Sequence, residues 1–141
     1  MNDRDVETYM TEDQFEVSER IRKLLENYHK LDSDITEYIQ SKIRRHIYIE
    51  ESILFPTLPV RLKEDVDYLE REHGRILASL EQLKNLSETV DQRAVLEKLY
   101  YLLQEHNSYE ESFVYDYFLG KGLEIISTIT SPPDSWKAKY E

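Results

Sequence analysis

HIYIEESILF, residues 46–55, and HNSYEESFVY, residues 106–115, follow the same pattern of His, three residues, Glu-Glu-Ser, two residues and an aromatic. The chain has four histidines, and two of them begin these segments. Residues four apart lie on one face of an α-helix, so His46 is paired with Glu50 and His106 with Glu110. The repeat therefore predicts two helices that carry the same pair of polar groups.

The positions of helix-breaking residues divide the rest of the chain. Only three Gly and four Pro occur, and apolar residues recur at helical spacing between the breaks. The predicted helices cover about residues 12–31, 34–55, 62–86 and 92–119. We expect an all-α protein, an antiparallel up-down four-helix bundle forming a single domain over residues 1–141. The bundle takes up about 12–119, and a C-terminal extension, 120–141, contains a possible short helix at 122–130. The first dozen and last ten residues are expected to be frayed.

Each predicted helix has one histidine on its apolar face, namely His29, His46, His73 and His106. Residues equidistant from the turn lie side by side in antiparallel helices. The midpoint of His73 and His106 falls at 89–90, within a polar turn, so these two are expected at one level. The same reasoning places the second helix's His-Glu pair beside His73. The midpoint of His29 and His46 falls past the polar cluster at 32–34, so a first turn centred later is needed.

Taken singly, these residues have ordinary explanations. A lone His on an apolar face is usually a satisfied core residue, and a lone His-Glu pair is usually exposed. The whole set needs another explanation, because two buried carboxylates at one level cost several kcal/mol without cations. Lys and Arg fall mainly off these faces, so they do not supply those cations. Imidazoles and carboxylates bind first-row metals. Four His and two Glu suffice for two ions, with two His on each and both Glu as bridges.

The donor types narrow the choice of metal. The chain has no cysteine, which excludes thiolate sites and disulfides. A set that includes imidazoles is unsuited to calcium or magnesium. A dinuclear nitrogen and oxygen site in a helical bundle favours iron, with manganese or zinc as alternatives.

Overall charge and hydropathy exclude other classes. The net charge of −11 argues against nucleic acid and against an anionic membrane surface as partners. No apolar run approaches the roughly 18 residues of a membrane span, and the N-terminal residues do not resemble a signal peptide. We expect a cytoplasmic protein.

The sequence resembles the hemerythrin-like family, also called the HHE cation-binding domain, over about residues 12–119. The resemblance rests on YHKL around His29, HIYIEESILFP with His46 and Glu50, REHGRIL around His73, and EHNSYEESF with His106 and Glu110. It implies two iron ions, oxo- or hydroxo-bridged. His29 and His46 would bind one ion and His73 and His106 the other, with Glu50 and Glu110 bridging them.

Two positions depart from the oxygen-carrying members of that family. Those proteins have a fifth His one turn after the third helix's His, where this chain has Leu77. They also have an Asp five residues after the last His, where Glu111 follows Glu110. Loss of a ligand favours a reactive, open position over oxygen storage.

The resemblance therefore implies a non-haem di-iron protein that reacts with or binds O2, NO or H2O2 in oxidative or nitrosative stress, with peroxidase or NO-reducing activity left open. An electron donor would be supplied in trans. A reversible oxygen carrier or sensor, and an iron store or donor for iron–sulfur cluster repair, are the alternatives. Four neighbouring residues are further candidates for the site, as a ligand, a hydrogen-bond partner or a point of close approach: Glu70, Gly74, Tyr109 and Glu111.

Overall fold

A computed structural model describes residues 5–26, 33–86, 88–126 and 132–141, and four long helices account for most of them. They are α1 (Val6–Glu26), α2 (Ser33–Ile49), α3 (Lys63–Asn85) and α4 (Thr89–Phe113). No strand occurs in these ranges, where one isolated bridge joins Asp5 and Gly122. The all-α prediction is confirmed.

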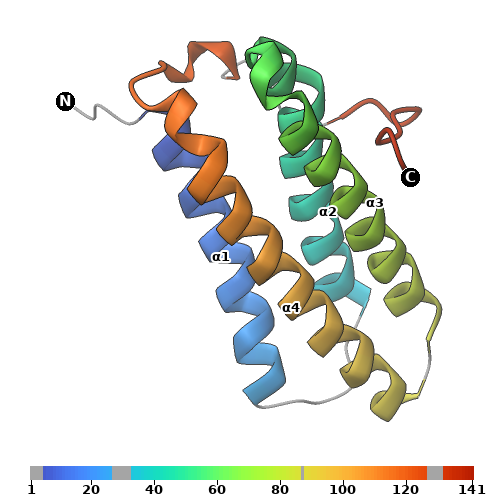
Figure 1. The fold of residues 1–141 in the computed structure, drawn as a ribbon. Coiled ribbons are helices and arrows are strands. Elements are labelled where there is room, and N and C mark those ends of the chain that lie inside the picture. The colour runs from blue at the N-terminus through green and yellow to red at the C-terminus, as the bar shows by residue number, and fades with distance from the viewer. Residues whose placement is uncertain (1–4, 27–32, 87, 127–131) are drawn as a thin grey trace.

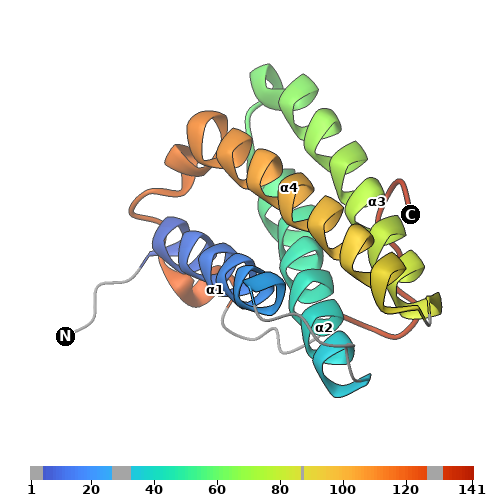
Figure 2. The ribbon, with the colours of Figure 1, turned by 90° about the horizontal axis from the view of Figure 1, so that it is seen from below.

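The helices form an up-down bundle in which consecutive helices run antiparallel (Figure 1). α4 packs against both α1 and α3, and α2 contacts the same two helices from the other side (Figure 2). Each helix thus has two neighbours and one face turned inward, as its apolar periodicity predicts. None of the described helices is long and apolar enough to cross a membrane.

The second helix ends differently from the prediction. The regular helix stops at Ile49, and a π-helical turn, Glu50–Leu54, follows, then a 3-10 turn, Phe55–Thr57. Pro56 has no backbone N–H, so the chain cannot continue a helical ladder through it. π-helical turns are often found at functional sites, and this one begins at a glutamate of the repeat.

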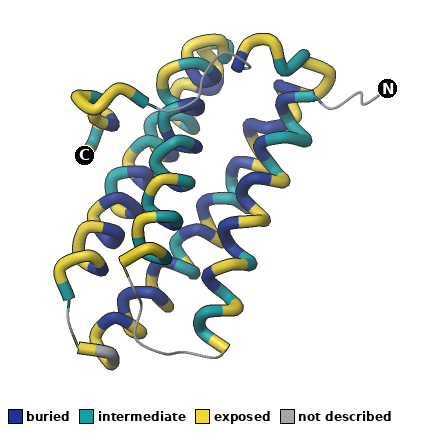
Figure 3. The backbone as a smooth tube through the Cα atoms, turned by 180° about the vertical axis from the view of Figure 1, so that it is seen from behind, coloured by how far each residue is buried: buried dark blue, intermediate teal, exposed yellow. Residues whose placement is uncertain are grey.

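The buried residues line the inner faces of the helices (Figure 3). They form two apolar clusters with a polar layer between them. One cluster includes Ile21, Ile43 and Leu99, and the other includes Met10, Leu69 and Phe118. Each helix or the turn that follows it contributes buried polar residues that lie between members of the two clusters. These polar residues are Asp13, Gln14, His46, Glu50, His73, His106 and Glu110. Apolar packing above and below thus fixes the height of the polar layer.

Both ends of the chain are more ordered than predicted. The prediction that the first dozen residues fray is wrong from Val6 onward, because Val6 and Met10 are fully buried. The prediction for the last ten residues is also wrong, since Ala138 is buried in the core. Within 122–130, a short 3-10 turn, Leu123–Ile125, forms, and residues 127–130 lie outside the described part of the chain.

Candidate metal centre

Four buried residues from α3, α4 and the π-helical turn offer donor atoms to a common point. Glu50, His73, His106 and Glu110 each have one such atom within 4.8 Å of the other three. His73 Nε2 lies 3.0 Å from Glu50 Oε1, and His106 Nε2 lies 3.0 Å from Glu110 Oε1. Donors that share one ion at about 2.1 Å are about 3 Å apart when adjacent, so these spacings suit one metal ion.

The far nitrogen of each described imidazole is held by a carboxylate. His46 Nδ1 lies 2.8 Å from Asp13, His73 Nδ1 lies 2.6 Å from Glu51, and His106 Nδ1 lies 2.9 Å from Glu72. Each carboxylate accepts the Nδ1 proton, which leaves Nε2 aimed at the polar layer. This carboxylate–histidine arrangement is the one that orients metal-binding imidazoles.

The Nε2 atoms of His73 and His106 are only 3.1 Å apart. Each Nδ1 keeps its proton and donates it in a hydrogen bond to a carboxylate. Two neutral rings of this kind would therefore turn their Nε2 lone pairs toward each other, so a cation is needed between them. Without metal that cation is a proton. Burial disfavours the charged form of His106, but Glu110 and Glu72 outweigh burial and raise its pKa to about 10. Burial likewise opposes the charged form of His73, yet its bonds to Glu50 and Glu51 raise its pKa.

The negative charge of Glu50 disfavours ionisation of Glu110, the other glutamate of the repeat. Both are fully buried. Burial and the neighbouring charge of Glu50 raise the pKa of Glu110 to about 7. Two carboxylates that share a dry site cannot both ionise cheaply without a cation, so the site favours positive charge between them.

A second group of donors lies beside His46. Its Nε2 is 3.1 Å from the Tyr115 hydroxyl and 3.8 Å from Glu50 Oε2. The Tyr115 hydroxyl donates to that same Glu50 oxygen at 2.8 Å and accepts a hydrogen bond from Gln14 Nε2 at 2.8 Å. One phenol proton cannot satisfy both Glu50 and a neutral His46, so this position also calls for a cation. Glu50 contacts both groups and is placed to bridge them.

Two buried acceptors test whether a metal suits the layer. Among the described side chains, Gln14 Oε1 and Glu110 Oε2 are the buried oxygens without a hydrogen-bond partner. Such atoms cost roughly 1–3 kcal/mol each when unpaired. Both residues touch the cluster, because Gln14 Nε2 donates to Glu110 Oε1 at 2.6 Å. Unpaired acceptors beside imidazole and carboxylate donors fit metal cations, and the residues present therefore suit the metal site that their types predict.

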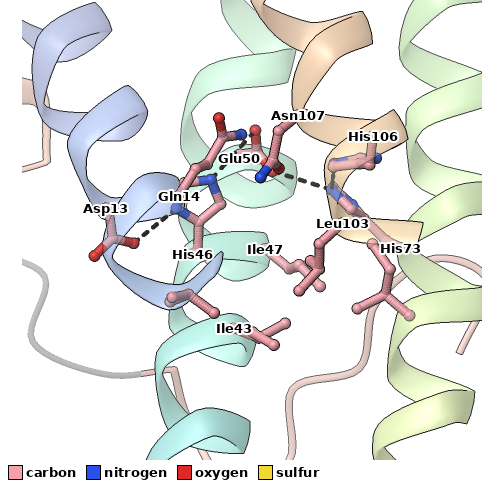
Figure 4. A pocket seen from close by; sticks show the side chains of 12 residues that line it. Asp13, Gln14, Ile43, His46, Ile47, Glu50, His73, Leu103, His106 and Asn107 are labelled. Carbon is pink, nitrogen blue, oxygen red and sulfur yellow. Dashed lines mark hydrogen bonds and ion pairs between the residues drawn. The ribbon is translucent and has the colours of Figure 1, made fainter. Parts of the chain in front are cut away.

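A cavity of about 20 Å³ adjoins both donor groups. That volume holds about one water-sized molecule. Polar groups line one side of it, including Gln14, His46, His73 and Asn107, while apolar side chains such as Leu103 close the other (Figure 4). The cavity admits a very small ligand and excludes an organic substrate.

The sequence prediction is reproduced unevenly by the structure. Five of its six proposed ligands, His46, Glu50, His73, His106 and Glu110, lie in the polar layer, at the common level that the turn midpoints predict. His29 lies outside the described residues. Their role as ligands stays a prediction.

The further candidates Glu70, Tyr109 and Glu111 do not bond the donor cluster in the structure. Glu51, rather than Glu70, bonds His73, and Glu70 lies 3.7 Å from Lys139 Nζ. The Tyr109 hydroxyl donates to Asp65, away from the cluster. Glu111 is exposed, and Leu77 is buried in the apolar core, where it offers no donor.

Sequence reasoning missed Asp13, Gln14, Glu51, Glu72 and Tyr115. Tyr115 had a signal, because it is the aromatic that ends the second copy of the repeat. Its counterpart Phe55 stacks on His73 with ring centroids 5.9 Å apart. The repeat thus places an aromatic beside each donor group, and only the second carries a hydroxyl. Glu51 and Glu72 had a weaker signal as direct sequence neighbours of predicted ligands.

The bundle, the buried His and Glu layer and the carboxylate-held imidazoles together define a metal-binding helical-bundle protein. The hemerythrin HHE cation-binding domain family matches residues 11–118, which contain all four helices but for the first five residues of α1. The chain belongs to the hemerythrin-like family. No match is found among curated proteins or solved structures.

Proposed function

We propose that this protein binds two iron ions and reacts with a molecule as small as O2, NO or H2O2, in defence against oxidative or nitrosative stress. The observation that carries the proposal is the convergence of Glu50, His73, His106 and Glu110 on one point beside a cavity of about 20 Å³. Bound iron would supply the redox chemistry, and electrons for repeated turnover would come from a donor in trans.

The residues divide between two metal positions. His73, His106 and Glu110 would hold the first ion, and Glu50 would reach both. His46 and Tyr115 would hold the second, where the carbonyl oxygen of Gln14 is a further donor once its amide is turned. Iron suits this set of nitrogen and oxygen donors better than zinc, which prefers four-coordinate sites in structural roles.

The protein's own groups also control protons and water. Asp13, Glu51 and Glu72 keep the Nδ1 protons of the imidazoles in place, so each Nε2 stays available to a metal. The apolar side of the cavity excludes bulk water from the reacting molecule. The Tyr115 hydroxyl is buried and donates to Glu50 Oε2, so it would also help to orient the carboxylate that reaches both positions.

Reversible oxygen carriage or sensing is the second candidate function. The apolar wall of the cavity favours it, because a dry pocket protects a bound oxygen molecule from protonation and loss. Leu77 favours the reactive alternative, because the position holds no imidazole to fill the first ion's coordination.

One absorption experiment separates these functions. The protein is loaded with ferrous iron under argon, oxygen is admitted, and the near-ultraviolet and visible bands are recorded before and after a second argon sparge. The proposal predicts a charge-transfer band that persists after sparging, and accelerated consumption of peroxide or nitric oxide. A band that disappears on sparging supports the carrier instead. Absence of any band with iron bound would contradict both.

A further inference from the structure

The C-terminal strap, residues 132–141, lies outside the residues that match the family and beside the metal layer. It runs along α2 and α3 at the side of the bundle, as Figures 1 and 2 show. Ala138 is buried in the apolar core, and the Trp136 ring meets Tyr48 edge to face at 5.1 Å. Arg44 binds the strap twice, through the Trp136 carbonyl at 2.5 Å and the Glu141 carboxylate at 2.7 Å. The strap is therefore docked on the bundle by apolar and polar contacts.

One strap contact leads directly to the candidate metal site. The backbone N–H of Lys139 donates to Glu51 Oε1 at 2.9 Å. The other oxygen of the same carboxylate accepts the Nδ1 proton of His73 at 2.6 Å. Glu51 has a side chain only 6% exposed, so these two bonds define its position. A chain of three groups joins the strap backbone to an imidazole of the metal layer.

Gly74 gives the strap the room that it needs. A Cβ at Gly74 would lie 2.7 Å from the carbonyl oxygen of Tyr140, closer than a Cβ approaches a backbone atom. Glycine in the middle of a helix costs roughly 1 kcal/mol relative to alanine. At this point of α3 the absence of a side chain leaves room for the strap to cross directly beside His73. The crossing also lets the Tyr140 hydroxyl donate to Asp67, about two turns before Gly74 on the same face of α3.

We infer that the C-terminal strap is a positioning element for metal binding, which acts through Glu51 on the orientation of His73. Docked, the Lys139 N–H holds the Glu51 carboxylate where it fixes the His73 ring. Undocked, Glu51 is free to turn toward water, and His73 loses the partner that aims its Nε2 at the metal. Metal binding and strap docking then stabilise each other by the same factor, because coupling between two sites is reciprocal. The inference rests on the proposed metal site.

Substitutions in the strap and at Gly74 of α3 test the inference without altering any proposed ligand. Lys139→Pro removes the N–H, whereas Lys139→Ala keeps the N–H and removes the side chain beyond Cβ. Gly74→Ala strengthens the α3 helix but displaces the strap. Outer partners of metal ligands are worth 10–100-fold in affinity. With Zn²⁺ as probe in chelator competition, we expect Lys139→Pro and Gly74→Ala to bind about tenfold more weakly, and Lys139→Ala to bind like the natural chain.

Two further measurements distinguish positioning from a general loss of stability. In a double-mutant cycle, Glu51→Gln with Lys139→Pro should bind Zn²⁺ no more weakly than Glu51→Gln alone, because both changes act through one bond. Exchange of the Lys139 amide hydrogen should slow about tenfold when Zn²⁺ is added to the natural chain. Trp136 is the only tryptophan, so its emission reports whether the strap is docked in each variant.

The outcomes separate failure of the inference from failure of the proposed function. Additive losses in the cycle, an amide whose exchange ignores Zn²⁺, or natural affinity in Lys139→Pro with the strap undocked would each overturn the positioning role. In all three cases the natural chain still binds metal. Failure of the natural chain to bind Zn²⁺ or ferrous iron would instead overturn the metal site itself, and the inference with it.

Discussion

Replacing Glu110 with Gln should make the metal-free protein more stable and its metal binding much weaker. Glu110 is fully buried, and its Oε2 has no hydrogen-bond partner in the described structure. Burial and the charge of Glu50 raise its pKa from 4.5 to about 7. A carboxyl whose pKa is raised by folding destabilises the folded state as pH rises from the unfolded pKa through the folded one. At pH 8 that cost is fully developed.

The size of the effect follows from the shift. Each pKa unit corresponds to about 1.4 kcal/mol, so the ionised Glu110 costs the metal-free fold on the order of 3 kcal/mol at pH 8. A neutral amide of the same shape avoids this cost, and its carbonyl oxygen can accept a hydrogen bond from the Nε2–H of the charged His106 ring. For a domain of this size we expect a rise in Tm of about 10 °C. Loss of a direct donor should exceed the 10–100-fold known for outer partners, so affinity should fall at least about 100-fold.

The assay is thermal unfolding of the chelator-treated protein at pH 8, paired with a ferrous iron competition titration. Glu105→Gln, an exposed glutamate on the same helix, is the matched control and should change neither result. At pH 4 the gain in Tm from Glu110→Gln should vanish, because the natural carboxyl is then protonated as well. A variant that is less stable than the natural chain at pH 8, or that binds iron normally, would refute the reasoning.

Three further predictions follow from the same geometry. Glu72→Gln should weaken metal binding about 10–100-fold by loosening the Nδ1 proton of His106, and an affinity equal to that of the Glu105→Gln control would contradict it. Tyr115→Phe should lower the affinity for the second metal ion about tenfold and spare the first, as measured by stepwise titration, while Tyr109→Phe should change neither, because its hydroxyl bonds Asp65. The Tm of the metal-free protein should fall as pH rises from about 6.5 to 10. Folding raises the pKa of His106, so the charged ring stabilises the fold below the unfolded pKa, and this stability is lost as pH rises through the folded pKa. A Tm that rises over this range would be evidence against the buried imidazolium.

The bundle and its central level were predictable because they depend on periodicity and turn position. The midpoint of His73 and His106 at a polar turn indicates their common level, and their Nε2 atoms do lie 3.1 Å apart. Apolar residues on both sides of each His fix the helix faces. These features are local or symmetric, so a single sequence contains them.

The carboxylates behind the imidazoles were not predictable in the same way. Adjacent residues of a regular α-helix point about 100° apart, so Glu50 and Glu51 are not expected at one ring. Both reach His73, one at each nitrogen, because the π-helical turn widens the backbone at these residues. A change of helix type of this kind has no clear composition signal.

The two ends of the chain show the limits of composition. α1 begins at Val6 rather than at residue 12, which places Asp13 and Gln14 at the level of the site. The proline-containing C-terminal segment has the composition of a tail, yet Ala138 is buried and Lys139 bonds Glu51. Such docking depends on the complementary surface of α2 and α3, and above all on the space at Gly74.

The most direct test of the central claim is a crystal structure of the iron-loaded protein with anomalous data collected at the iron absorption edge. We expect two anomalous peaks bridged by Glu50, one bound by His73, His106 and Glu110 and the other beside His46 and Tyr115. A single peak, peaks away from the polar layer, or the absence of a peak in crystals grown with excess iron would contradict it.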